Sequence, residues 1–278
     1  MAGTFLHLHL AIGSFPAAFG LRPEERPAEL PSFLAGTLAP DVGFFPGGPR
    51  TFSHRVHHEA TGDFVRALLS AARSSVDEAF AAGWALHVEI DVATHPLVNL
   101  QASYKLHELS ADRPDLWHKR IEWGLDCEIL GATVYQPPLW EQPLQFSAEM
   151  LVSAARSVYG IEVNPHRLRR RLSALAGWIQ RLAMILFWSG SASRDLVLVP
   201  WRGPGRLPNV ARTLARRFEN LSCVEDLVAI LSPEVPEEGF TLTALAASDI
   251  AVAAFHRGWA ERFVNVANRD LDTGQVVA

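Results

Sequence analysis

The chain has 278 residues, of which 49% are hydrophobic and 20% are charged, and its formal net charge at pH 7 is −5. This length and balance fit a globular protein with a large hydrophobic core. The negative charge gives no general attraction to nucleic acid, and two cysteines far apart exclude a disulfide framework or a thiolate metal site. No basic, apolar leader opens the sequence, and the apolar run at 182–188 is too short to span a bilayer. We therefore expect a cytoplasmic protein without a transmembrane segment.

Histidine is the residue whose distribution is most informative. Nine of the eleven histidines occur at or before His118, and only His166 and His256 follow it. Histidine is a frequent metal ligand and changes charge near neutral pH. Chemistry that depends on imidazole is therefore expected from the first half of the chain.

The first two predicted elements are helices separated by a proline-rich connection. Residues 5–19 alternate at first like a strand, but their Ala and Leu content and the lack of a hairpin partner favour a helix. His7 and His9 face different directions on that helix, so at most one of them joins a given site. A short apolar helix at 33–38 stops at Pro40, and Asp41 follows in a loop rich in Gly and Pro. Taken alone, such an aspartate is usually a cap or turn residue.

A third helix is expected from Ser53, a suitable N-cap, to about residue 73. His54, His57 and His58 lie at i, i+3 and i+4 and share one face of it. Three histidines are more than a surface helix needs, although not all of them can bind one ion.

The longest predicted helix spans 76–109 and carries His87, Asp91 and His95 at four-residue steps. Each step drifts by only about 40° around the helix, so the three side chains form one stripe. The flanking residues are apolar almost all round, which indicates a buried helix, bent near Pro96. Burying this stripe is costly without a compensating partner. A metal ion suits these ligand types, and a hydrogen-bonded core network is the alternative.

A further helix at 112–130 has Pro114 in its first turn and carries His118 and Glu122 at i, i+4. The second half of the chain remains helical in pattern but contains no recognisable motif. We predict an all-α, single-domain multi-helix bundle over residues 1–278, with metal-binding helices in 1–130 and a helical wall or lid in 131–278. Helical spacing in that second half occurs near 147–159, 166–188, 209–218, 224–231 and 243–265, and 197–199 could be a short extended piece.

The candidate ligands combine imidazole nitrogen with carboxylate oxygen and include no thiolate, a mixture typical of catalytic zinc. Their number exceeds the three or four protein ligands that one zinc ion takes, so two or three ions are expected. Asp91 lies between two histidines and is placed to bridge two ions. A di-iron bundle would need Glu-x-x-His spacing, whereas the spacing is His-x-x-x-Asp and His-x-x-x-Glu. The candidates are His9 (or His7), Asp41, His54, His87, Asp91, His95, His118 and Glu122.

These motifs, in this order, resemble the zinc-dependent phospholipase C family, which is related to bacterial phosphatidylcholine-cleaving enzymes and fungal single-strand-specific nucleases. The resemblance covers the region from about residue 5 to 125, and the second half matches nothing recognisable. The segments that carry it are His9-Leu10-Ala11-Ile12, Phe33-Leu34-Ala35-Gly36-Thr37-Leu38-Ala39-Pro40-Asp41, Ser53-His54, His87-x-x-x-Asp91-x-x-x-His95-Pro96 and His118-x-x-x-Glu122.

The resemblance implies three zinc sites, the third of which takes a processed N-terminal amino group in the family. His57 could replace His54, and His7 could replace His9. Glu59 or Glu89 could hold the histidine tautomers from outside the ligand set. The implied ligands are Asp41, His54, His87 and Asp91 for the first ion, His95, His118 and Glu122 for the second, and His9 with Asp91 for the third.

The expected activity is hydrolysis of a phosphodiester or phosphomonoester by metal-activated water, which Asp41 orients. A lipid substrate would need an apolar rim, for which Phe44, Phe45 and Trp140 are available, although each could equally be a core residue. The net negative charge disfavours a nucleic-acid substrate. One alternative is a metal-dependent hydrolase or cyclase acting on a small molecule in a specialised pathway. Another is a non-catalytic helical metal-binding protein, disfavoured because structural zinc sites prefer cysteine. The sequence leaves the oligomeric state open.

Overall fold

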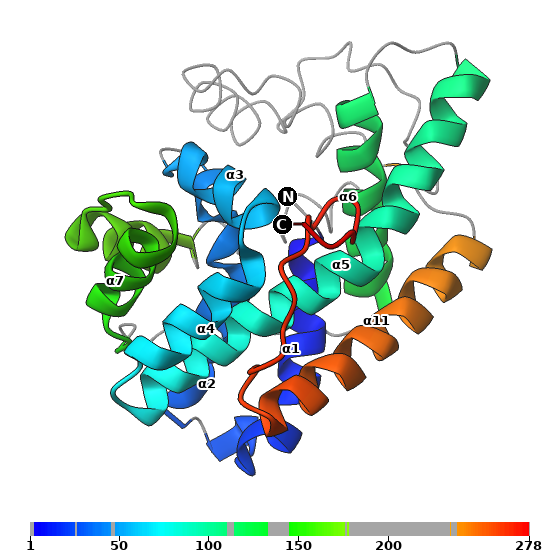
Figure 1. Cartoon of the computed structure of the whole chain (residues 1–278). Coiled ribbons are helices and arrows are strands. Elements are labelled where there is room, and N and C mark those ends of the chain that lie inside the picture. Colours follow the sequence, from blue (N-terminus) through cyan, green and yellow to red (C-terminus); the bar gives the residue numbers. More distant parts are fainter. Residues whose placement is uncertain are drawn as a thin grey trace, which may run out of the picture.

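The computed structural model describes residues 3–25, 27–45, 48–109, 114–132, 145–175, 177, 234 and 238–277. These parts are mainly helical, and their only β pairing is an isolated antiparallel bridge between Arg269 and Val276. The predicted all-α class is confirmed. The elements are α1 (Thr4–Phe19), η1 (Pro23–Glu25), α2 (Glu29–Leu38), η2 (Pro40–Gly43), α3 (Arg50–His58), α4 (Thr61–Ala71), α5 (Ser75–Leu109), α6 (Pro114–Ala132), α7 (Ala148–Tyr159) and α11 (Glu238–Ala260) (Figure 1).

The long helix α5 is the centre of the fold. It packs against α2, α4, α6 and α11, and Figure 1 shows it crossing the molecule with α11 alongside. It stays helical through Pro96 to Leu109. Most of its first half is apolar and fully buried, as the sequence predicted. The helix that carries the stripe of candidate ligands is therefore held on several sides.

Two glycines allow α2 and α5 to pack backbone to backbone. A Cβ atom at Gly36 would lie 2.0 Å from the carbonyl oxygen of Phe80, and one at Gly83 would lie 2.0 Å from that of Phe33. Both distances are impossible for a real side chain, so each position requires glycine while the helices keep this separation. The close approach brings the backbone of α2 within reach of side chains on α5.

The prediction of one helix from Ser53 to residue 73 is wrong. The segment forms α3 and α4, separated where Glu59 is extended and Ala60 takes a left-handed conformation with φ 47°. The hydroxyl of Tyr159 donates to the Glu59 carbonyl at 2.7 Å and stabilises this break. Ser53 is not an N-cap, because α3 already begins at Arg50; its Oγ accepts a hydrogen bond from the Gly43 N–H at 2.7 Å.

The second half of the chain is described in part. Helix α7 matches the predicted helix at 147–159, and 165–175 is helical where 166–188 was predicted. The predicted helices at 209–218 and 224–231 and the extended piece at 197–199 lie outside the described residues. Helix α11 begins before the predicted 243–265 and ends at Ala260, because Arg262 and Phe263 take left-handed conformations with φ 56° and 52°.

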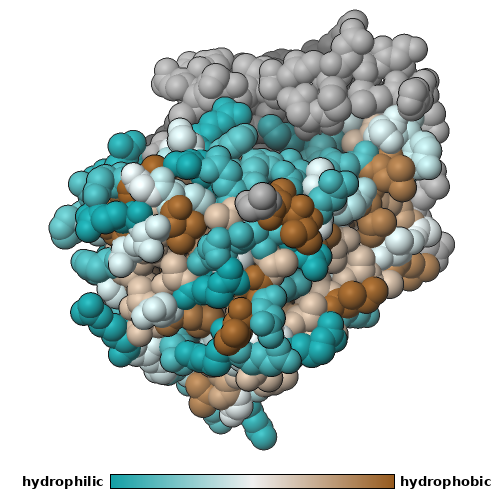
Figure 2. All heavy atoms as spheres, viewed as in Figure 1, coloured by the Kyte–Doolittle hydropathy of each residue, from teal (hydrophilic) through white to brown (hydrophobic). Residues whose placement is uncertain are grey.

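Helix α11 is long and apolar enough over Gly239–Ala260 to cross a membrane by length and composition. A helix that packs in a soluble protein passes the same test, and α11 packs on α5 and α1. Its exposed apolar residues include Leu242 and Ile250. On the face drawn in Figure 2, apolar side chains form small groups separated by polar ones. A cytoplasmic location stays a prediction.

The C-terminal segment (Glu261–Val277) follows α11 and returns over α4, α3 and α5, as Figure 1 shows. Thr61 of α4 exchanges two hydrogen bonds with the backbone of Arg269, at 2.9 and 2.8 Å. The N–H of Leu271, which is fully buried, donates to the carbonyl oxygen of His57 at 2.8 Å. These contacts join the end of the chain to its first half, and the single domain stays a prediction.

Candidate metal centre

The stripe on α5 is buried and faces α1, α3 and α6. His87 and Asp91 are completely inaccessible to solvent, and His95 is 3% exposed. Asp91 is the central group: its carboxylate oxygens lie 2.9 Å from Nε2 of His87, 3.1 Å from Nε2 of His7 and 3.3 Å from Nε2 of His95. Nε2 of His57 lies 3.7 Å away. Four imidazoles from three helices therefore converge on one carboxylate.

Among the residues that the structure describes, the side chains that could hold metal ions form three groups, within each of which the ligand atoms lie no more than 4.8 Å apart. The first two groups share His87. In the third, Oε1 of Glu122 lies 2.8 Å from Nε2 of His118 and 3.2 Å from Nε2 of His95. The groups are His7–His87–Asp91, Asp41–His57–His87 and His95–His118–Glu122.

Most of the candidate ligands predicted from the sequence lie in these groups. Asp41, on η2, is buried, with Oδ1 3.2 Å from Nε2 of His57. His9 and His54 are exposed and lie outside the groups, whereas their predicted alternates His7 and His57 occupy the corresponding places. Helix geometry explains this, because a shift of two residues on α1 turns the side chain to nearly the opposite side, and a shift of three on α3 displaces it by about 4.5 Å along the axis. The predicted ligands that the structure brings together are Asp41, His87, Asp91, His95, His118 and Glu122.

Each of the five histidines has its Nδ1 atom engaged by an oxygen acceptor. Because backbone carbonyls and carboxylates only accept hydrogen bonds, these partners keep the proton on Nδ1 and turn the Nε2 lone pair toward the groups. Such outer partners are characteristic of histidines that bind metals. The partners of Nδ1 are Gly3 O for His7 at 3.0 Å, Ser53 O for His57 at 2.7 Å, Thr37 O for His87 at 2.9 Å, Asp272 Oδ1 for His95 at 3.1 Å and Asn99 Oδ1 for His118 at 2.6 Å.

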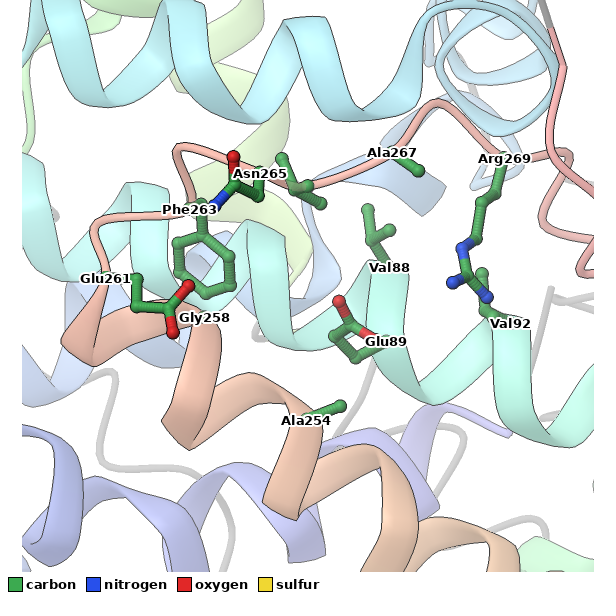
Figure 3. A pocket seen from close by; sticks show the side chains of 11 residues that line it. Val88, Glu89, Val92, Ala254, Gly258, Glu261, Phe263, Asn265, Ala267 and Arg269 are labelled. Atoms are coloured by element: carbon green, nitrogen blue, oxygen red, sulfur yellow. The ribbon is translucent and has the colours of Figure 1, made fainter.

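The acidic outer partners expected from the sequence are not the ones found. Glu59 pairs with Arg55 on the surface, with Nε to Oε2 at 2.9 Å. Glu89 follows His87 by two residues and so points to the opposite side of α5. It lines a separate cavity of about 220 Å³, toward which Arg269 also points (Figure 3). That cavity contains none of the candidate ligands.

Several buried polar atoms of the groups have no hydrogen-bond partner among the residues that the structure describes. They include both oxygens of Asp41 and of Asp91, and Nε2 of His7 and of His95. The short nitrogen–oxygen contacts around them are therefore not hydrogen bonds. Burial of unpaired carboxylates is costly, whereas a cation among them would satisfy oxygen and nitrogen lone pairs together. The donor set, imidazole nitrogen and carboxylate oxygen, fits zinc.

The carboxylates of the groups are held in the ionised form. Burial opposes ionisation of Asp91, but the neighbouring His87, His95 and His7 outweigh it and hold the pKa of Asp91 well below its ordinary value. Glu122 behaves likewise: burial acts against its charge, and His118 lowers its pKa below the ordinary range. Both groups are therefore ready to bind a cation at neutral pH.

One known protein family matches this chain. The sequence profile of the zinc-dependent phospholipase C family matches residues 8–161, more than half of the 278 residues. The chain belongs to this family. No curated protein and no solved structure matches it. Family membership and the three ligand groups together support a zinc-dependent hydrolase.

Asp126 of this phospholipase C-family protein was not among the functional residues predicted from the sequence. It continues the four-residue spacing of His118 and Glu122 on α6, which was the available signal. Its Oδ1 accepts the backbone N–H groups of Phe5 at 3.1 Å and Leu6 at 3.0 Å, so it caps the start of α1. Burial raises the pKa of Asp126 to about 7. The cap fixes the helix that presents His7.

Replacing Asp126 by alanine is expected to lower the free energy of unfolding by roughly 1–3 kcal/mol, because the substitution removes the acceptor of two buried N–H groups. Urea unfolding of the zinc-free protein measures this change. Asp126→Asn, which keeps an oxygen at the same place, is the matched control and is expected to lose less. A loss from the asparagine variant equal to that from alanine would contradict the capping role.

Proposed function

We propose that this protein hydrolyses a phosphodiester or phosphomonoester by means of metal-activated water. The observation that carries the proposal is the position of Asp91 between the ligand groups, within 3.3 Å of the Nε2 atoms of His7, His87 and His95, since a carboxylate shared by several groups favours a multinuclear zinc centre. Structural zinc sites are instead usually single, closed and rich in cysteine. Multinuclear centres are typical of enzymes that cleave phosphate esters.

The ligands divide between ions according to the lone pairs that they offer. His87 binds only one ion, because its Nδ1 is occupied by the Thr37 carbonyl. We assign His87 to the ion held by Asp41, His57 and Asp91. The second ion takes His95, His118 and Glu122. The third position then keeps His7 and Asp91 and is the weakest of the three, so two zinc ions bind firmly.

Zinc bound in this centre would lower the pKa of water and offset the charge that develops on the phosphoryl group. The chain itself supplies orientation. Asp41 has two carboxylate oxygens without hydrogen-bond partners among the described residues. One oxygen can face an ion while the other accepts a hydrogen bond from the attacking water. This hydrogen bond aligns the water, and the Asp41 carboxylate takes up the proton that the water loses. The histidine ligands do not compete for that proton, because Nδ1 already carries one and Nε2 faces the metal groups.

The substrate we favour is a phospholipid or a smaller phosphate ester. Phe44 is half-buried, and its ring meets the His57 ring edge-on at 5.3 Å, so an apolar group lies beside the proposed ligands. Phe45 is a core residue with 6% exposure, and Trp140 lies outside the described residues. The net charge of −5 disfavours a polyanionic nucleic acid.

The test compares the zinc-loaded protein with its Asp41→Asn variant on bis(4-nitrophenyl) phosphate, 4-nitrophenyl phosphate and phosphatidylcholine vesicles. The variant is expected to lose at least about 100-fold in kcat, the lower range for a group that handles a proton. Its zinc-free thermal unfolding should stay close to that of the parent, because the two side chains have the same shape. Failure of the zinc-loaded parent to cleave any of these esters would contradict the proposal and favour the non-catalytic alternative.

A further inference from the structure

Asp272 lies in the C-terminal segment, far along the chain from every proposed ligand. Its Oδ1 accepts a hydrogen bond from Nδ1 of His95 at 3.1 Å, and its Oδ2 lies 3.9 Å from Nε2 of His58. Its side chain is 49% exposed, whereas that of His95 is 4% exposed. A residue at the surface thus reaches the outer side of a buried imidazole whose Nε2 faces the metal groups.

The backbone of the same residue acts on the second histidine of the group. The carbonyl oxygen of Asp272 accepts the Nδ2–H of Asn99 at 2.8 Å. Because an amide nitrogen only donates, this bond turns the amide oxygen of Asn99 toward Nδ1 of His118, at 2.6 Å. His118 must then donate from Nδ1 and keep the lone pair on Nε2. One residue therefore fixes the tautomers of both histidines in the group His95–His118–Glu122.

The turn that carries Asp272 is held on both sides. Oδ1 of Asp270 accepts the Thr273 N–H at 2.9 Å, and its Oδ2 lies 2.9 Å from Nδ1 of His58. The carbonyl oxygen of Asp270 accepts the Gly274 N–H at 2.8 Å. Gly274 has φ +69°, and a Cβ atom there would lie 3.0 Å from the Val92 carbonyl. Glycine thus suits this position, and the turn is pinned to α3 and α5.

We propose that Asp272 is a positioning residue of the metal centre, which orients His95 with its side chain and His118 through Asn99. The proposal rests on the zinc centre of the proposed function. Residue 272 lies outside the 8–161 region shared with the family, so this part of the centre is supplied by the remainder of the chain. A carboxylate on the outer nitrogen also makes the histidine a stronger donor to a cation.

The experiment measures zinc affinity by competition with a chromophoric chelator, on the full chain and four variants. Asp272→Ala is expected to weaken one zinc equivalent about 10–100-fold, the usual effect of losing an outer partner. Asp272→Asn should weaken it less, since the amide oxygen still accepts but carries no charge. Asn99→Ala should weaken the same equivalent through His118. Asp249→Asn, an exposed carboxylate on α11, is the matched control and should change nothing.

Cobalt substitution supplies a second readout that does not depend on activity. The visible absorption of the affected cobalt equivalent should change in Asp272→Ala and Asn99→Ala and stay as in the parent for Asp249→Asn. Release of all zinc equivalents together by the Asp272 variants, or unchanged affinity, would overturn the positioning role. A parent protein that binds no zinc at all would overturn both this inference and the proposed function. A parent protein that binds zinc but cleaves no ester would overturn only the proposed function and leave the positioning role of Asp272 standing.

Discussion

Replacing Asp91 by asparagine is expected to strip zinc from the centre and to reduce phosphate-ester hydrolysis more than about 100-fold, beyond the usual effect of an outer partner. Asp91 lies within 3.3 Å of the Nε2 atoms of His7, His87 and His95. In the proposed centre its carboxylate would be shared by neighbouring ions, so its loss is expected to weaken more than one site. Metal content per chain and the rate on bis(4-nitrophenyl) phosphate, measured on the same preparation, check the prediction.

Glu89→Gln is the matched control for Asp91→Asn. It neutralises a carboxylate two residues away on α5 that lines the separate cavity, so zinc content and rate should stay at the parent level. Retention of all bound zinc by the Asp91 variant would show that the carboxylate bridges nothing. An equal loss from both variants would assign the effect to the helix rather than to the site.

Removal of zinc by a chelator is expected to lower Tm strongly. At a free zinc concentration about a thousand times the Kd, each ion stabilises the folded state by about 4 kcal/mol. For a domain of this size, that corresponds to a fall of roughly 8–16 °C for each ion removed. The physical cause is the set of buried carboxylates, which lose their compensating cation. Differential scanning calorimetry with and without chelator measures the change.

Readdition of metal distinguishes this effect from damage by the chelator. Zinc should restore Tm, whereas magnesium should not, because magnesium prefers oxygen ligands and keeps much of its own water. An unchanged Tm after complete removal of zinc would mean that the histidine stripe is stable as a hydrogen-bonded core network. That outcome would favour the alternative left open by the sequence.

The sequence predicted the parts of the centre that depend on local periodicity. His87, Asp91 and His95 share a stripe because four-residue steps nearly match the helical turn, and His118 with Glu122 repeats the pattern on α6. The choice between His7 and His9 depends on how α1 is rotated about its axis. Asp126 holds the start of α1 by accepting the Leu6 N–H from 120 residues further along the chain. The local sequence pattern of α1 gives no information about such a long-range hydrogen bond.

The outer partners show the same limit. The carbonyl partners of His7 and His57 lie four residues earlier on their own helices and could be read from spacing. Asp272 lies 177 residues from His95, and the connection depends on the return of the C-terminal segment over α5. The division of 53–73 into α3 and α4 was missed, and the hydrogen bond that stabilises the break comes from Tyr159, a distant residue. Tertiary contacts decided each of these features.

The backbone contact between α2 and α5 has a consequence for which substitutions the protein can tolerate. His87 is oriented by the carbonyl oxygen of Thr37, and every amino acid carries such an oxygen. The side chain of residue 37 is therefore not what orients this ligand, although Thr37 is itself buried and donates to the Phe33 carbonyl at 2.9 Å. Gly36 and Gly83 contribute no side chain to the centre, yet a methyl group at either would push the helices apart and withdraw the carbonyl. In this protein, two positions that carry no side chain are therefore expected to be sensitive ones for the metal centre.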